Sequence, residues 1–354
     1  MEAYIRGIGN ISPQPTFDNG SFLEEIREFH HARLQAIEPD YKSYIKPIQL
    51  RRMSRLLKMG VTAAGISLHD AGVEKPDAII TGTGLGMMEE TEKFLNGMLD
   101  NQERLLNPTA FIQSTHNTVG ASIAVMLGCN NYNLTYVHGP VSFENALLDG
   151  LMWLQERPSD KVLVGGIEEI TADHFIITES MGFWKTGEVS NLGILEDDRP
   201  GTIAGEGASF FVLSREASPG NYARIRALSS RFNPEKEDIL QDYLASFLNS
   251  QDLALSDIDL LILGYNGDPG SDAVYGKVKY LSGHLPVCWY KHLSGEHYLA
   301  SSFALWLGAR IAKSQYVPAV VLTQGSRNHG QIRNILIHNH YQNIHHSLML
   351  VSSC

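Results

Sequence analysis

The sequence predicts an α/β protein whose sheets are buried between layers of helices. Strand-like and helix-like segments alternate along the 354 residues, and strands such as Lys161–Val164 and Leu260–Leu263 are continuous apolar runs. Such runs are typical of strands that helices cover on both faces. A helix rich in small residues followed by an apolar strand occurs in each half of the chain. This recurrence favours an internal duplication.

The first elements follow this alternation. A strand is predicted at Ala3–Ile8, and a helix at Met53–Ala71, where apolar residues recur at helical spacing. Pro76–Ile80 then leads into the glycine-rich segment Thr81–Gly86. Its glycines do not have the spacing of a dinucleotide-binding fingerprint, so we expect only a tight strand-to-helix turn.

The rest of the first half continues in the same way. A helix is predicted at Asn117–Leu127, a strand at Tyr132–Val137 and a helix at Ser142–Leu154. The buried strand Lys161–Val164 is closed by two glycines, Gly165 and Gly166.

A boundary between the halves is predicted at the polar segment 214–221, which contains a Pro-Gly pair after the strand that ends at Phe210–Leu213. The expected halves are therefore 1–214 and 221–354. The second half supplies a strand at Leu260–Leu263, a helix at Ala300–Ala312 and a strand at Ala319–Thr323.

Composition excludes several classes of protein. Hydrophobic residues make up 43% and charged residues 19%, as expected for a large core, and the net charge of −11 argues against nucleic acid and anionic membranes. The N-terminus lacks a signal-peptide pattern, and no run is long enough to span a membrane. Three scattered cysteines, Cys129, Cys288 and Cys354, predict neither a disulfide framework nor structural zinc. We expect a cytoplasmic protein.

Several polar residues are candidates for a site. His138 ends a predicted strand, and Ser142 is expected to cap the helix that follows. Lys291, Glu296 and His297 lie within seven residues, which fits either acid–base machinery or a solvated loop. Other polar residues have simpler interpretations. Glu206 could form an ion pair with Arg199. Four histidines crowd the C-terminus without nearby carboxylate or cysteine ligands, so we interpret them as the composition of the tail rather than as a metal site: His338, His340, His345 and His346.

Five segments in order give the sequence a resemblance to the β-ketoacyl-acyl carrier protein synthases of the thiolase-like superfamily. They are Tyr4–Pro13, Arg51–Arg55, Gly165–Glu168, Asp198–Gly201 and Gly205–Ala208, the last two resembling the Asp-Arg-x-Gly and Gly-Glu-Gly-Ala of that family. The resemblance runs nearly end to end. It implies a thiolase-like fold with two duplicated halves in α/β/α/β/α layers, and it implies no cofactor or metal.

Members of that family use a cysteine nucleophile at a strand-to-helix elbow. The elbow reads Thr-Val-Asp-Thr-Ala-Cys in the family and Thr135–Pro140 here, so the cysteine position falls on Pro140. A register shift of two residues offers His138 or Ser142 instead. Proline carries no nucleophile, and none of the three cysteines can occupy the elbow.

The family's two histidines and its supporting lysine are carried over in the same way. The first histidine position falls on Asn266, whose amide can still donate to an oxyanion. In Lys-x-x-x-Gly-His, the lysine is Lys291 and the histidine falls on Glu296, with His297 one residue later if a bulge intervenes. The family's glycine-rich loop near the C-terminus is placed at Ser326–Gly330.

These substitutions predict a divergent member that resembles the chain-length factors of the family, which lack the nucleophile and pair with an active synthase. The resemblance implies an acyl carrier protein as a partner, and a dimer, homomeric or heteromeric, built near Thr115–Asn117 and Tyr132–Val137. Two other functions stay open: an active or decarboxylase-only synthase using His138 or Ser142 with Asn266 and His297, and a non-enzymatic binding scaffold.

Overall fold

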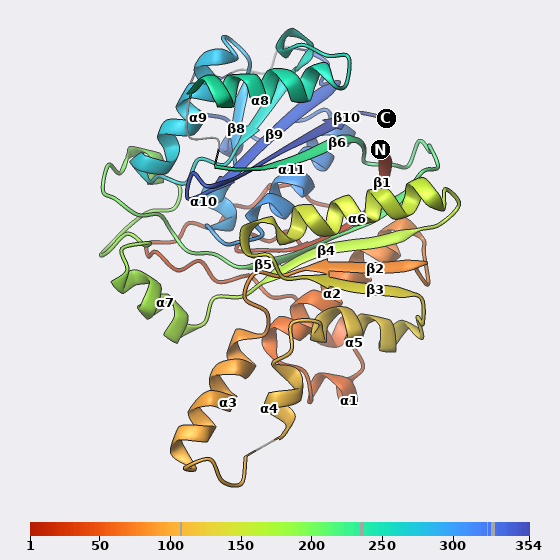
Figure 1. Cartoon of the computed structure of the whole chain (residues 1–354), viewed down its shortest axis with the longest axis vertical. Helices are drawn as coiled ribbons and strands as arrows, with labels where there is room; N and C mark the ends of the chain where they lie inside the picture. Colours follow the sequence, from red (N-terminus) through yellow and green to blue (C-terminus); the bar gives the residue numbers. More distant parts are fainter. Residues whose placement is uncertain (107, 234–236, 324, 327–329) are drawn as a thin grey trace.

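The structure, a computed structural model, describes the whole chain except residues 107, 234–236, 324 and 327–329 (Figure 1). Its described strands form one ten-stranded sheet in the order β3-β2-β4-β5-β1-β6-β10-β9-β7-β8. The strands are β1 (Ala3–Ile11), β2 (Ala78–Gly82), β3 (Tyr132–Tyr136), β4 (Val162–Glu168), β5 (Gly207–Ser214), β6 (Ala223–Phe232), β7 (Leu260–Leu263), β8 (Val287–Trp289), β9 (Asn334–Tyr341) and β10 (His345–Ser352).

The two halves of this sheet have the same topology. In the first, β2 is parallel to β3 and β4, while β5 runs antiparallel to both β4 and β1. In the second, β7 is parallel to β8 and β9, while β10 runs antiparallel to both β9 and β6. A short antiparallel pairing of β1 with β6 joins the halves. The repeated order supports the duplicated architecture that the sequence predicts.

The side chains of each half-sheet alternate between two different layers of helices, as expected for strands buried on both faces. In β4, Leu163 packs outward with helices α2 and α5, whereas Val162 and Val164 face the interior with α6 and α11. In β10, Leu348 packs outward with α8 and α9, whereas Met349 faces the same interior. The layers are therefore α/β/α/β/α (Figure 1), which confirms the predicted fold class.

The helices of these layers are α2 (Arg55–Ala71), α5 (Thr118–Leu127), α6 (Ser142–Glu156), α8 (Glu237–Asn249), α9 (Pro269–Leu281) and α11 (Ala300–Ser314). The other helical segments are α1 (Pro47–Leu50), α3 (Met88–Asp100), α4 (Pro108–Gln113), α7 (Ala172–Ser180), α10 (Lys291–Ser294), η1 (Tyr41–Ser43), η2 (Gly139–Val141), η3 (Ile194–Glu196), η4 (Leu255–Asp257) and η5 (Ala319–Val321). Helices α3 and α4 project from the first half (Figure 1). None of the helices in the described part of the chain is long and apolar enough to cross a membrane.

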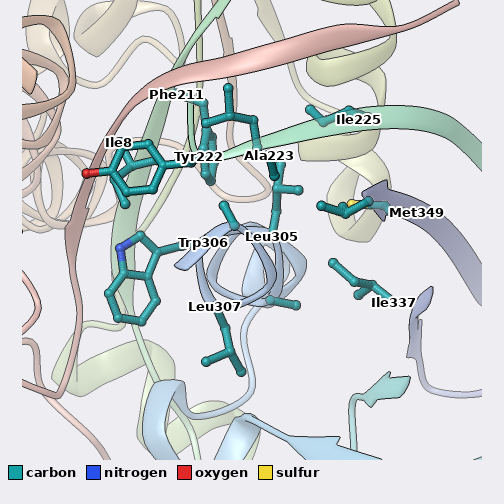
Figure 2. Close-up of a cluster of buried hydrophobic side chains, with 14 of the residues drawn as sticks. Ile8, Phe211, Tyr222, Ala223, Ile225, Leu305, Trp306, Leu307, Ile337 and Met349 are labelled. Carbon is teal, nitrogen blue, oxygen red and sulfur yellow. The ribbon is translucent and has the colours of Figure 1, made fainter. Parts of the chain in front are cut away.

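Helix α11 is the centre of the core. It is buried at every position from Ala300 to Ala312, because its small and apolar residues occupy all faces of the helix. Figure 2 shows α11 end-on, surrounded by side chains of both halves. Those drawn and labelled around it are Ile8, Phe211, Tyr222, Ala223, Ile225, Ile337 and Met349. Helix α11 therefore packs against both halves.

The strand predicted at Ala319–Thr323 is wrong. This segment begins as the 3₁₀ helix η5, and only Leu322 makes an isolated bridge, to Cys288. Pro318 sets the turn, since the backbone N–H of Val321 donates to its carbonyl oxygen. A short apolar run cannot be distinguished from a buried turn by its pattern alone.

The interpretation of the C-terminal histidines as tail composition is also wrong. His338 and His340 lie in β9, and His345 and His346 lie in β10. His338, His340 and His346 are at most 2% exposed. Within the described residues, no group of three or more histidine, cysteine, aspartate or glutamate side chains is arranged to hold a metal ion.

The link between the halves lies between the end of β5 at Ser214 and the start of β6 at Ala223. This link contains the segment 214–221 that the sequence singles out. The division into halves 1–214 and 221–354 stays a proposal about where each unit begins and ends.

Candidate functional site

Three polar residues of the second half meet where parallel strands end. Asn266 follows β7, and Lys291 begins α10 just after β8. Because the carboxyl ends of parallel strands lie at one edge of a sheet, the two side chains converge. Both donate to Glu296 Oε2: Lys291 Nζ at 2.8 Å and Asn266 Nδ2 at 2.8 Å. Lys291 is 1% exposed and Glu296 is 6% exposed, so this ion pair is buried.

The loop that carries Asn266 is held by a neighbouring carboxylate. The backbone N–H groups of Asn266 and Gly267 donate to Asp272 Oδ1 and Oδ2 at 2.8 and 2.9 Å. Burial raises the pKa of Asp272 to about 6, although these two donors act in the opposite direction. The Asn266 side-chain oxygen accepts from the backbone N–H of Asp268 at 3.0 Å. Both ends of the Asn266 amide are thus engaged.

Glu296 is fixed through its backbone as well. Its N–H donates to the carbonyl oxygen of Ile203 at 2.8 Å, and the N–H of Gly205 donates to its carbonyl oxygen at 3.0 Å. This isolated bridge places the Gly205–Ala208 segment of the first half directly against the end of α10. The arrangement explains why glycine is required at position 205, since a Cβ atom there would collide with the backbone of Ser294 and Gly295.

His297 lies beside this ion pair but takes no part in it. Its Nδ1 accepts from the backbone N–H of Leu299 at 3.3 Å. Burial, with a smaller effect of the Lys291 charge, lowers the pKa of His297 to about 3, so the imidazole is neutral. Glu296, not His297, is therefore the partner of Lys291.

Two small cavities adjoin Glu296. One, of about 130 Å³, is lined by polar residues that include Asn266, Asp268 and Ser271. The other, of about 40 Å³, is lined by His297 and by acidic residues of the first half. Glu296 and Tyr341 line both. Ligand pockets for drug-sized molecules are typically about 300–1,000 Å³, so neither cavity has room for a long acyl chain.

The elbow residues are not part of these cavities. Ser142 Oγ accepts from the backbone N–H of His138 at 2.8 Å and donates to the carbonyl oxygen of Gly139 at 2.8 Å. Ser142 is the first residue of α6 rather than its cap, which corrects the expected capping role. Pro140 lies within η2, and His138 is exposed. None of His138, Pro140 and Ser142 lines either cavity.

Glu168 and Glu169 are site residues that the sequence did not single out. Glu168 accepts from the backbone N–H groups of Gly84 and Leu85 at 2.7 and 3.1 Å, which fixes the glycine-rich turn after β2. Burial raises the pKa of Glu168 to about 8 and that of Glu169 to about 7. Both line the smaller cavity. The feature of the sequence that could have identified these two residues is an acidic pair at the end of an apolar strand.

The expected pair of Arg199 with Glu206 does not form. Glu206 instead accepts from Arg55 Nη1 at 2.8 Å and Nη2 at 2.6 Å, a bidentate contact across 151 residues of sequence. Arg199 pairs with Asp197, its near neighbour, at 2.9 Å. The loop placed at Ser326–Gly330 lies largely outside the described residues, because these exclude 327–329.

Residues 28–180 match the family described as β-ketoacyl synthase, N-terminal domain. Through this segment, which is less than half of the chain, the protein is similar to the β-ketoacyl synthase family. The segment holds the projecting helices α3 and α4, the elbow, and both glutamates of the smaller cavity. No curated protein matches the sequence.

Solved structures of ketosynthases share the fold over the whole chain. The ishigamide ketosynthase/chain length factor superposes with a TM-score of 0.82 at 17% identity, covering 100% of this chain and 99% of that one. A ketosynthase in complex with its chain length factor from Xenorhabdus doucetiae gives 0.77 at 13% identity, covering 99% and 98%. A type II polyketide synthase acyl-carrier protein in complex with its hexaketide-bound ketosynthase gives 0.74 at 13% identity, covering 100% and 99%. At these identities the likeness establishes the fold.

Proposed function

We propose that this chain is a non-nucleophilic, chain-length-factor-like subunit that pairs with an active ketosynthase in fatty acid or polyketide biosynthesis of the polyene type. The observation that carries this proposal is the closed Lys291–Glu296–Asn266 contact. A ketosynthase needs donors aimed at the oxygen of a developing enolate. Here the side-chain donors of Asn266 and Lys291 point at an internal carboxylate instead.

The elbow supports the same function. Pro140 has no group that can form a thioester, and both hydrogen-bonding directions of the Ser142 hydroxyl are taken by backbone groups. Among the residues that the structure describes, no hydrogen bond joins the 138–142 turn to Asn266, Glu296 or His297. The alternative of a decarboxylase that uses these residues is disfavoured further because Glu296 already occupies the side-chain donors of Asn266 and Lys291.

A dimer is proposed through the free edge of the sheet. Strand β3 is the terminal strand, and in the described part of the chain nothing pairs with its outer edge. Long unpaired edges are templates for pairing with another chain. Apolar side chains are exposed on and near it: Val125 on α5 at 81%, Leu134 at 38% and Val137 at 40%. The exposed His116 precedes α5 on the same side of the half.

A basic segment is proposed to dock the acyl carrier protein. Lys42, Lys46, Arg51 and Arg52 are exposed between η1 and α2 in a chain whose net charge is −11. None of the ion pairs found within the described residues involves these four side chains. Their complement is a carrier protein with an acidic face, which such a patch would steer and orient.

The activity prediction concerns the chain alone and with a partner. Incubated alone with malonyl and acyl carrier protein, it is expected to give neither a labelled acyl-enzyme nor carbon dioxide above a blank. Mixed with a candidate partner ketosynthase that has an intact cysteine nucleophile, it should co-elute as a heterodimer and support chain extension. Leu134→Arg at the edge should abolish co-elution, whereas Tyr280→Arg, which introduces the same charge at an 85% exposed aromatic site on α9, should not. Acyl labelling of the isolated chain would refute the proposal.

The carrier-protein prediction uses a charge reversal. Arg51→Glu combined with Arg52→Glu is expected to weaken binding of the carrier protein about tenfold at low salt, and less at high salt. The matched control is Arg215→Glu with Arg333→Glu, which changes the net charge equally at exposed sites of other elements. Titration by fluorescence anisotropy measures both. Equal weakening by the two pairs would mean that net charge, rather than this segment, controls binding.

A further inference from the structure

A continuous chain of hydrogen bonds links buried histidines on β9 and β10. His338 Nε2 lies 3.1 Å from His346 Nδ1, and His346 Nε2 lies 3.2 Å from the carbonyl oxygen of Asn343. Asn343 belongs to the turn between the two strands, where its φ is +56°. The two imidazole rings are stacked with an interplanar angle of 24°.

His340 holds the same turn from the other side. Its Nδ1 accepts from the backbone N–H of Asn343 at 3.3 Å, and its Nε2 lies 3.0 Å from the carbonyl oxygen of Ser271 in the first turn of α9. The ring stacks on Tyr275 of α9 with centroids 4.2 Å apart. Asn343 Nδ2 also donates to the carbonyl oxygen of Gly270 at 3.1 Å. The turn is therefore tied to α9 as well as to the strands.

These partners fix the tautomer of each ring. A carbonyl oxygen only accepts, so His346 and His340 must each carry their proton on Nε2. His346 Nδ1 is then a bare acceptor, and His338 must donate to it from Nε2. His338 Nδ1 is left bare, buried and without a partner. All three imidazoles are neutral in this arrangement.

None of these rings can take a second proton in the closed arrangement without losing a hydrogen bond or leaving an N–H group without an acceptor. A proton on His346 Nδ1 would face the N–H of His338, and a proton on His340 Nδ1 would face the N–H of Asn343. A proton on His338 Nδ1 would find no acceptor. We propose that His338, His340 and His346 form a proton-sensitive clasp that holds the β9–β10 turn against α9 and opens when it takes up protons. Tyr341 and Gln342 of this turn line the 130 Å³ cavity with Ser271, so the clasp positions one wall of that cavity.

Burial and a nearby positive charge also oppose protonation of the clasp. Burial lowers the pKa of His346 to about 4, and it lowers the pKa values of His338 and His340 well below their usual range. The positive charge of Lys291 lowers the pKa values of His338 and His340 further. The titratable and charged groups near the clasp come from α9, from the α10 region and from β10. Lys291 and His345 act on the rings directly, and Tyr275 packs on His338 and His340. Asp272, Tyr290 and Glu296 in turn surround Tyr275.

Linkage gives the sign of the effect. Folding lowers the pKa of each imidazole below its free value of about 6.5. The contribution of such a group to the stability of the closed turn is therefore fully present above pH 6.5, and it is lost as the pH falls below that value. Each proton taken up on opening raises the opening constant tenfold per pH unit. Two rings hold Asn343 directly, so a tenfold to hundredfold increase per pH unit is expected between about pH 6.5 and 5.

Amide hydrogen exchange of the whole chain, followed by NMR and corrected for intrinsic rates, measures this opening at the N–H groups of Asn343 and Ile344. The proposal expects their protection to fall with pH as stated while that of β2 and β4 amides is unchanged. Imidazole ¹⁵N shifts should show Nε2–H tautomers for all three rings. Protection of the turn that is independent of pH, or that falls in parallel with that of β2 and β4, would overturn the proposal.

A pair of neighbouring variants separates the clasp from ordinary packing. His346→Gln should lower the pH slope at Ile344 by one proton, a tenfold smaller change per pH unit. His345→Gln is the matched control, because that ring is only partly buried, packs on Phe232 and makes none of the hydrogen bonds of the clasp. The charge of His345 lowers the pKa of His346, so this variant should shift the pH at which the turn opens but leave the slope unchanged. Equal slopes in the two variants would contradict the assignment, and if His346→Gln fails to fold, the wild-type slope alone decides. None of these outcomes depends on whether the chain pairs with a ketosynthase.

Discussion

Lys291→Met is expected to lower the free energy of unfolding by about 3–5 kcal/mol. The substitution leaves Glu296, 6% exposed, as a buried carboxylate whose remaining side-chain donor is Asn266 Nδ2 at 2.8 Å. It also removes the contact of Lys291 Nζ with the carbonyl oxygen of His340 at 3.2 Å. Urea unfolding at neutral pH, followed by circular dichroism, measures the loss.

The double variant Lys291→Met, Glu296→Gln tests the physical reason. A neutral amide accepts from Asn266 without a charge to desolvate, so the double variant should recover more than half of the loss. Glu296→Gln alone should be intermediate, because it leaves the ammonium group without its carboxylate. A double variant no more stable than Lys291→Met would show that the cost comes from packing of the lysine stem and not from the unpaired carboxylate.

The recovery bears on function. Replacing both partners of a buried ion pair with neutral groups is often close to neutral for stability, so stability alone does not explain why the pair is present. The pair holds the side-chain donors of Asn266 and Lys291 on Glu296. Under the function proposed above, the ion pair would be the group that fills the site of a subunit without chemistry of its own.

The sequence predicts the fold where burial and residue type agree. Leu260–Leu263 is apolar throughout and Ala300–Ala312 consists mainly of small and apolar residues, and they form β7 and the central helix α11. The prediction from sequence fails where polar side chains are buried through contacts with specific partners. His338 and His346 look like tail residues because the groups that satisfy them, each other and Asn343, are assembled only by the β9–β10 hairpin.

The site is predictable to the extent that its contacts are local. Lys291 and Glu296 are five residues apart, and their proximity can be inferred from the sequence alone. Asn266 is 30 residues from Glu296 and enters only through the family resemblance. The partner of Glu206 lies 151 residues away, and no spacing rule connects it with Arg55. Its local candidate, Arg199, is instead taken by Asp197, two residues away.

Gly205→Ala is expected to destabilise the protein by about 3 kcal/mol, at the upper end for overpacking. A Cβ atom on Gly205 would lie 1.9 Å from the carbonyl oxygen of Ser294 and 2.6 Å from Gly295 Cα. These are backbone atoms, which cannot move aside as a flexible side chain would. Gly295 itself has a φ of +69°, a conformation that other residues rarely adopt, so the partner segment cannot adjust easily.

Gly276→Ala is the matched control for this substitution. Gly276 lies in α9, and a Cβ atom there would meet nothing within 4 Å. Alanine is the better helix former, so this variant should be more stable by about 0.5–1 kcal/mol. The change from glycine to alanine is thus expected to lower stability at position 205 and to raise it at position 276. Thermal unfolding of both variants measures these two effects. If Gly205→Ala were as stable as the wild type, the close contact between the Gly205–Ala208 segment and the end of α10 would be disproved. The position of Glu296, which depends on that contact through the Gly205 N–H, would then have to be revised as well.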